Sequence, residues 1–214
     1  MKIHLAVPIT GLDDSAIRLR TDFLTSIARP GTEITYSRIR EGPLAIECAV
    51  DHARAANEVL KLVGPAEEAG ADVIIIWCAG DPGLNAARTL VDVPVVGPGE
   101  SMRLLIQLLG RNPAAIPAPI PVLDLRKDIE KTMRLSLLQI NELTKRGHDA
   151  FYLDCLGMFG MGRPLRDLTC LPIIDPAEAS LEVAEVMVHL GLRHSRAAYP
   201  KYPPNHRHHL NNLK

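Results

Sequence analysis

The sequence has few aromatic residues, no excess of one charge and no long apolar run. Aromatic residues make up 4% of the 214 residues, which argues against a base-stacking surface for nucleic acid. The 24 lysines and arginines balance 25 aspartates and glutamates, so neither a strongly basic nucleic-acid binder nor an acidic tail protein fits. No apolar stretch reaches the ~18–20 residues of a membrane helix. We therefore expect no nucleic-acid partner and no membrane span.

The cysteines also lack a pattern that would indicate zinc or thioredoxin-type redox chemistry, because no C-x-x-C pair occurs. They are Cys48, Cys78, Cys155 and Cys170. The first ten residues read as a strand without a signal-peptide cleavage site, so we expect free thiols and a cytoplasmic location. Three histidines near the C-terminus, His206, His208 and His209, have no partner carboxylate, and we expect no metal there.

Strand-like and helix-like segments alternate along the chain. Residues 2–10 and 32–39 read as strands, and residues 72–78 form the continuous apolar run of a buried parallel strand. With helical spacing between them, these segments predict an α/β fold of parallel sheets covered by helices. Residues 111–121 contain four prolines, which predicts a linker or an extended edge.

The most informative feature of the chain is an internal repeat. Its two matches lie at offsets of 77 and 78 residues: GADVIIIWC (70–78) with GHDAFYLDC (147–155), and VPVVGPGES (93–101) with LPIIDPAEA (171–179). The repeat indicates two pseudo-equivalent lobes and places a cysteine at the end of a buried strand in each. Ligands bind outside the carboxyl ends of parallel strands, so two facing lobes would present Cys78 and Cys155 to one cleft.

The paired cysteines point to acid–base chemistry. A thiol that precedes a helix N-terminus is expected to have a lowered pKa and to act as a base. Two such groups on opposite faces of a small substrate can remove a proton and return it from the other side, which inverts a carbon centre without a cofactor. A single cysteine in a buried strand is more often core filler, and we assign that role to Cys48 and Cys170, which have no repeat partner.

Acidic residues near predicted helix starts have simpler interpretations. Asp81 followed by Pro82 predicts the N-cap of a helix. Glu100 and Glu178 occupy repeat-equivalent helix starts, where a carboxylate favours the helix dipole. Glu47, early in another predicted helix, could reach the cleft.

The loop CAGDPGL at residues 78–84 is the most specific motif. With the other motifs it resembles the aspartate/glutamate/hydantoin racemase superfamily, most closely the hydantoin and allantoin racemase branch, over about four-fifths of the chain. The other motifs are PGTEI (30–34), GPLAIE (42–47), VPVVGPGES (93–101), CLGM (155–158), LPIIDP (171–176) and HLGLRHSRAAYP (189–200). The resemblance implies two flavodoxin-like lobes, a cleft between them and cofactor-independent racemisation by Cys78 and Cys155.

The resemblance also implies how a substrate is held. Main-chain N–H groups at helix starts would bind its carbonyl or carboxylate oxygens and stabilise the enolate-like charge that follows proton loss. The implied residues are Ala79, Gly80, Asp81, Leu156 and Gly157, with Pro8 and Thr10 in the loop after the first strand. The implied partner is a small molecule, with no metal or cofactor, and the implied assembly is a homo-oligomer.

Three features depart from the family pattern. The first loop reads VPIT (7–10) instead of carrying asparagines, which removes hydrogen bonds from the pocket. The Pro-rich stretch replaces a strand and a helix, so we expect a shortened second lobe without its first strand. Asp154 precedes Cys155; alternation predicts it on the opposite face, although a nearby carboxylate would raise the pKa of the thiol.

We expect the first lobe to comprise residues 1–100 and 180–214 and the second residues 101–179. The main hypothesis is a cofactor-independent racemase of 5-substituted hydantoins or a related small α-carbonyl compound. One alternative is a decarboxylase or isomerase of a small diacid that uses a single cysteine; carbon dioxide release or cis–trans isomerisation without racemisation would identify it. Another is a non-catalytic ligand-binding relative, whose cysteines would react slowly with alkylating reagents.

Overall fold

The computed structural model describes residues 1–203 and contains two parallel sheets. The first sheet has the strand order β2-β1-β3-β4, with β1 (Lys2–Val7), β2 (Glu33–Arg38), β3 (Val73–Ile76) and β4 (Val95–Val96). The second has the order β5-β6-β7, with β5 (Pro113–Ile116), β6 (Ala150–Leu153) and β7 (Ile173–Ile174). Since parallel strands need crossover connections, this topology accounts for the alternation of strand and helix in the sequence. The predicted α/β fold with two parallel sheets is confirmed.

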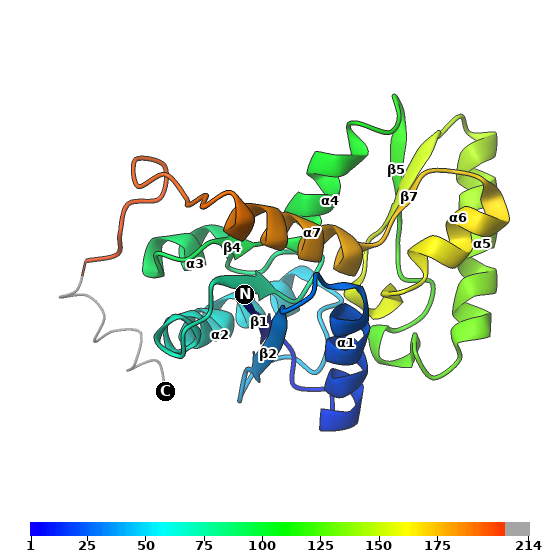
Figure 1. The fold of residues 1–214 in the computed structure, drawn as a ribbon. Helices are drawn as coiled ribbons and strands as arrows, with labels where there is room; N and C mark the ends of the chain where they lie inside the picture. Colours follow the sequence, from blue (N-terminus) through cyan, green and yellow to red (C-terminus); the bar gives the residue numbers. More distant parts are fainter. Residues whose placement is uncertain (204–214) are drawn as a thin grey trace.

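Helices cover both sheets and fill the space between them (Figure 1). They are α1 (Asp14–Ile27), α2 (Ala49–Glu68), α3 (Leu84–Leu90), α4 (Pro98–Ile106), α5 (Ile129–Lys145), α6 (Gly162–Thr169) and α7 (Pro176–His189). Two single 3-10 turns, η1 (Val122–Asp124) and η2 (Leu156–Met158), lie in the second lobe. Helices α4 and α7 pack against each other between the lobes, and α7 also contacts β3 while α4 contacts β6.

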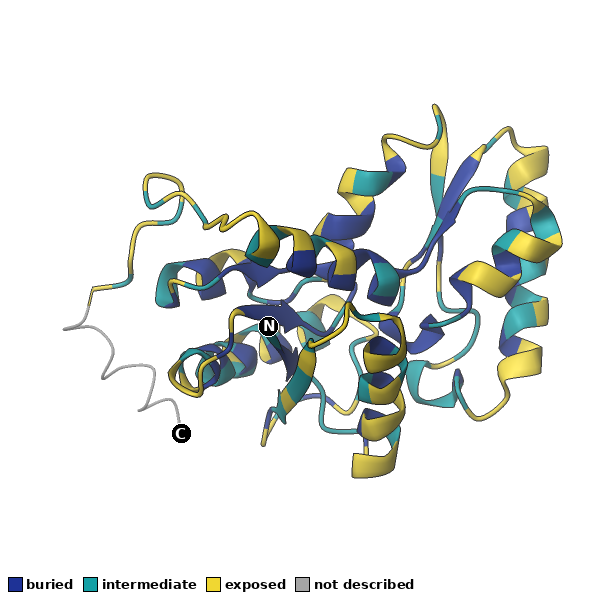
Figure 2. Ribbon diagram, in the orientation of Figure 1, coloured by how far each residue is buried: buried dark blue, intermediate teal, exposed yellow. Residues whose placement is uncertain are grey.

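One apolar core joins the two lobes. It contains Ile75 of β3, Ala150 of β6, Ile174 of β7 and Met102 of α4, all buried. Figure 2 shows the strands β1, β3, β4, β6 and β7 as largely buried, whereas the edge strands β2 and β5 and the outer faces of the helices are more exposed. The shared core fixes how the strand ends of one lobe face those of the other. The predicted lobe boundaries at residues 100 and 180 stay a prediction.

The internal repeat has a structural counterpart in each lobe. Strands β3 and β4 of the first sheet correspond to β6 and β7 of the second. An ion pair is repeated with them. Arg88 pairs with Glu100 and donates to Val95 O at 3.1 Å, while Arg166 pairs with Glu178 at 3.1 Å and donates to Ile173 O at 2.8 Å. Each glutamate therefore binds an arginine of the preceding helix, in addition to lying near the positive N-terminal end of its own helix dipole.

The Pro-rich stretch contains a strand, so the expected loss of the second lobe's first strand is wrong. β5 pairs with β6 at the edge of the second sheet, where a proline is tolerated because its missing N–H faces no ladder partner. The second sheet lacks a counterpart of β2 instead. A single helix, α5, connects β5 to β6, whereas α1, β2 and α2 separate β1 from β3.

The chain after α7 continues past the end of the first lobe near α3 (Figure 1). Arg196 donates to Arg88 O at 2.9 Å, Tyr202 N donates to Thr89 O at 2.9 Å, and Arg88 donates to the Tyr199 hydroxyl at 3.1 Å. The C-terminal motif is therefore part of the first lobe's packing. His206, His208 and His209 lie outside the described residues.

Asp175 caps α7 from a fully buried position and makes stability depend on pH. Burial, reinforced by the charge of Glu178, raises its pKa to about 6 from 3.8. A carboxyl with a raised pKa in the folded state stabilises the fold at low pH, and this contribution is lost as pH rises from about 4 through about 6. Between pH 7 and pH 5, protonation of Asp175 should add about 1 kcal/mol to the unfolding free energy of the parent. Asp175→Asn should lack this gain when the unfolding free energy is measured by urea denaturation at both pH values. Asp167→Asn, an exposed carboxylate of α6, should leave that gain intact; an unchanged gain in Asp175→Asn would contradict the prediction.

Candidate active site

A cavity of about 200 Å³ lies where the carboxyl ends of β3 and β6 face each other, and both predicted cysteines line it. The wall is formed by strand ends, by the loop after β1, and by the segments before α2 and at η1. Its residues are Ile9, Leu12, Arg20, Ile46, Trp77, Cys78, Ala79, Gly80, Val122, Asp154, Cys155, Leu156 and Gly157. The two lobes thus contribute one thiol each to one small space.

A tight turn holds Cys78. Its N–H donates to Ile76 O at 2.7 Å, and Asp81 N closes the turn on Cys78 O at 3.0 Å. Asp81 is not the N-cap of a helix at Pro82, as predicted, because it adopts φ +52° and α3 begins only at Leu84. Its carboxylate instead caps α4, accepting from Gly99 N at 2.8 Å and Glu100 N at 2.7 Å. The capping fixes the loop that carries Cys78 against the start of α4.

The turn at Cys155 is similar in outline and different in detail. Gly157 N donates to the Cys155 thiol at 3.4 Å, and Met158 N donates to Cys155 O at 3.0 Å. These bonds form the single turn η2. Asp154 lines the cavity beside Cys155, so the structure does not place it away from the site as strand alternation predicted, since β6 ends at Leu153.

Burial dominates the electrostatics of both thiols. It raises the pKa of Cys78 to about 12 and that of Cys155 to about 11. Hydrogen bonds from Gly80 and Gly157 act in the opposite direction, and the charge of Asp154 raises both values further. The expected lowering by a helix dipole is wrong. α3 starts six residues after Cys78, and Cys155 faces only one 3-10 turn.

Backbone donors are available next to each thiol. Among residues 1–203, the N–H groups of Ala79 and Leu156 have no protein acceptor, and both residues are buried in the cavity wall. Those of Gly80 and Gly157 face the thiol sulfurs. The Asp81 N–H is already used by Cys78 O. Of the five implied amide donors, the geometry therefore leaves those of Ala79 and Leu156 for a ligand.

Two implied residues of the first loop lie outside the cavity wall. The Thr10 hydroxyl donates to Pro43 O at 3.2 Å, and neither Thr10 nor Pro8 lines the cavity. Ile9 and Leu12 take their place. The loop therefore presents apolar side chains to a ligand.

Several wall residues were missed by the sequence analysis. Arg20 lies on the buried stripe of α1 between Ile17 and Leu24, so a lone arginine at core spacing is the signal that would have identified it. Trp77 is 4% exposed, and its indole N–H has no acceptor in the described part of the chain.

Glu47, which the sequence analysis expected to reach the cleft, precedes α2 and accepts from Val122 N at 2.8 Å. This bond draws the two lobes together at the rim of the cavity.

The other two cysteines are exposed, so their assignment to the core is wrong. The Cys48 thiol donates to Asp51 at 3.3 Å at the start of α2. Cys170 ends α6 with φ +57°. Both lie away from the cavity wall and serve as internal references for thiol chemistry.

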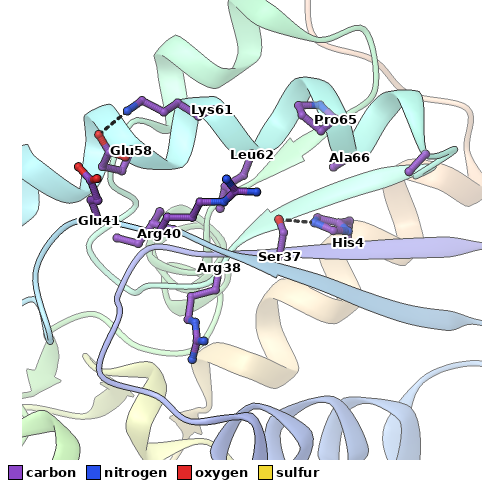
Figure 3. A pocket seen from close by; sticks show the side chains of 12 residues that line it. His4, Ser37, Arg38, Arg40, Glu41, Glu58, Lys61, Leu62, Pro65 and Ala66 are labelled. Atoms are coloured by element: carbon purple, nitrogen blue, oxygen red, sulfur yellow. Dashed lines mark hydrogen bonds and ion pairs between the residues drawn. The ribbon is translucent and has the colours of Figure 1, made fainter. Parts of the chain in front are cut away.

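A larger hollow of about 830 Å³ lies elsewhere, between β2 and α2 (Figure 3). His4 and Ser37 are hydrogen-bonded on its floor at 2.8 Å, and Lys61 pairs with Glu58 at its rim. Burial lowers the pKa of His4 to about 4, so its ring is neutral at pH 7. The hollow contains neither thiol of the repeat, and we assign the chemistry to the smaller cavity.

The described residues contain no cluster of acidic, histidine or cysteine side chains that could hold a metal ion. No helix among residues 1–203 is long and apolar enough to cross a membrane.

Known proteins are similar to this chain in sequence and in fold. The Asp/Glu/Hydantoin racemase family matches residues 20–116. A hydantoin racemase from Pseudomonas sp. (strain NS671) is 29% identical over 83% of both chains, and one from Rhizobium meliloti is 28% identical over 95% of both. An allantoin racemase structure from Klebsiella pneumoniae superposes with a TM-score of 0.85 at 27% identity, over 95% of both chains. The chain is therefore similar in sequence and in fold to the Asp/Glu/hydantoin racemase family.

These similarities confirm the resemblance found in the motifs. The family match covers Cys78 and its loop, whereas Cys155 lies beyond residue 116. The curated relatives are racemases, and racemases are isomerases. The roles of individual residues in this chain rest on the geometry of the cavity.

Proposed function

We propose that the protein is a cofactor-independent racemase of a 5-substituted hydantoin or a related small α-carbonyl compound, with Cys78 and Cys155 as its proton-transfer pair. The observation that carries the proposal is the placement of two thiols, from repeat-equivalent strand ends, in the wall of one cavity. The hydantoin and allantoin racemases among its relatives support the choice of substrate class.

The chemistry requires one thiolate and one thiol. The thiolate removes the proton from the α-carbon, and the thiol on the other face donates its proton to the resulting enolate, which inverts the centre. After one turnover, the group that began as the thiolate is a thiol and the group that began as the thiol is a thiolate. Burial raises both thiol pKa values, so a thiolate formed here is a stronger base than an exposed one.

The backbone donors stabilise the intermediate. Proton loss moves negative charge onto a carbonyl oxygen of the substrate, and the N–H groups of Ala79 and Leu156 are free to bind it. Donors held in place by folded turns need no reorganisation when this charge forms, and one such donor contributes about 10²–10³-fold to a rate.

The cavity limits the size and polarity of the substrate. Its volume of about 200 Å³ lies below the ~300–1,000 Å³ of ordinary ligand pockets. Ile9, Leu12, Ile46 and Val122 line it with apolar side chains. A compact ring with a short apolar substituent fits this wall better than a long or charged side chain.

Proton NMR in deuterated water tests the proposal. Single enantiomers of substituted hydantoins, allantoin, aspartate and glutamate are incubated with the protein, and the enzyme-free exchange rate is subtracted. We expect loss of the α-proton signal, with inversion, for at least one compact hydantoin or for allantoin. Protein-dependent exchange on no member of the panel would contradict the proposal, and carbon dioxide release from a small diacid would favour the decarboxylase alternative.

The homo-oligomer implied by the family resemblance is part of the same proposal. Sedimentation velocity at micromolar protein would show a mass above the 23.4 kDa of one chain if it is correct.

A further inference from the structure

Arg20 is a buried cation in the cavity wall that has no acidic partner. Arg20 is 6% exposed, and its guanidinium donates to Ala16 O at 2.6 Å within the same helix. Its guanidinium lies over the Phe159 ring, 5.2 Å from the centroid. None of the ion pairs among residues 1–203 includes Arg20.

An unpaired buried charge costs several kcal/mol, so its retention indicates a negative group that forms close by during function. The position of Arg20 indicates which group this is. Phe159, on which Arg20 stacks, lies four residues after Cys155 and directly follows η2. Arg126 also stacks on this ring, at 4.2 Å, and donates to Phe159 O at 3.0 Å, so the turn after Cys155 is held by two arginines.

The charges around the two thiols differ by one cation. Cys155 faces the positive charge of Arg20 and the N–H of Gly157, opposed by the carboxylates of Asp154 and Glu47. Cys78 faces the N–H of Gly80, while the nearby charges of Asp81, Asp154 and a Cys155 thiolate all disfavour its ionisation. Arg20 is therefore a cation of the cavity wall whose charge favours ionisation of Cys155, whereas the charges named for Cys78 all oppose its ionisation.

We propose that Arg20 is a positioning residue that stabilises the Cys155 thiolate, which makes Cys155 the base and Cys78 the acid of the resting enzyme. The inference deepens the proposed function and rests on it. An enantiomer whose α-proton points to Cys155 then meets the thiolate that forms more readily of the two. For the opposite enantiomer, a proton must first pass from Cys78 to Cys155.

Site-resolved alkylation tests this without any substrate. Iodoacetamide modification of each cysteine is followed by peptide mapping between pH 7 and pH 9, where the rate is proportional to the thiolate fraction. Arg20→Gln should slow Cys155 by about tenfold at each pH, equivalent to a rise of one pKa unit, and should leave Cys78 unchanged or faster. Arg20→Lys keeps the charge and should retain most of the Cys155 rate.

The controls separate this role from a structural one. Arg18→Gln removes an exposed arginine of the same helix and should change neither buried thiol. A variant that only loosens the fold would speed up both buried thiols, and the single tryptophan, Trp77, reports such loosening by its fluorescence. The exposed Cys48 and Cys170 calibrate the reagent.

The inference is overturned if the Cys155 rate in Arg20→Gln equals that of the parent, or if both buried thiols change together. It is likewise overturned if Arg20→Lys slows Cys155 as much as Arg20→Gln does. Since alkylation needs no turnover, a failure of the racemase proposal would appear in the deuterium exchange and leave the alkylation result readable.

Discussion

Cys155→Ala is expected to lower racemisation of either enantiomer by about 10³-fold, and Cys78→Ala by a similar factor, because a positioned acid or base contributes about 10²–10⁴-fold. Inversion needs a group on each face of the α-carbon, so removing one thiol stops both directions. Polarimetry on the compound identified by deuterium exchange measures the loss.

The two variants should also separate exchange from inversion. When one thiol is missing, the other can still remove a proton from its own face and return a deuteron to the same face. Exchange without inversion is therefore expected with one enantiomer for Cys155→Ala and with the opposite one for Cys78→Ala. Cys48→Ala, at an exposed thiol outside the cavity, should racemise at the parent's rate. Racemisation at the parent's rate in either cavity variant would exclude the two-thiol mechanism.

The juxtaposition of Cys78 and Cys155 could be predicted because it depends on local pattern. Buried parallel strands have a strong sequence signature, and a repeat places the same residue at the same strand end twice. The direction of the thiol pKa shifts could not be predicted in this way. It depends on how many segments close over the thiols, and Ile46 and Val122 come from parts of the chain that no local pattern links to either strand.

Long-range capping was also hidden from the sequence. Asp175 caps its own helix α7 through Ala177 N, but Gly97 at the equivalent position of the first lobe has no side chain. Asp81 supplies that cap from another loop, which requires its φ of +52°. Local sequence preference at Asp81-Pro82 predicts a cap on the next helix, α3. Asp81 caps α4 instead, and the N–H groups from which it accepts lie 18 and 19 residues further along the chain.

The same loop makes Gly99 the position where one added methyl group should do the most damage. A Cβ at Gly99 would lie 2.0 Å from the carbonyl oxygen of Ala79 and 2.8 Å from a carboxylate oxygen of Asp81. The first contact is with backbone, so the cavity loop itself must move. The equivalent position of the second lobe is Ala177, a fully buried residue that already carries a Cβ.

Gly99→Ala is therefore expected to lower the unfolding free energy by about 1–3 kcal/mol, as overpacking does. It should also slow deuterium exchange by about 10²-fold, since a displacement of about 1 Å in a site can cost that much. Gly64→Ala is the matched control: it adds the same methyl group within α2, where no atom outside the adjoining residues and the helix's own backbone lies within 4 Å, and it should leave deuterium exchange at the parent's rate. Urea denaturation and exchange on both variants decide the matter. If Gly99→Ala matched the parent in both stability and deuterium exchange, the cap of Asp81 on α4 would not be what holds the Cys78 loop in place. The geometry assigned to Cys78 would then have to be abandoned.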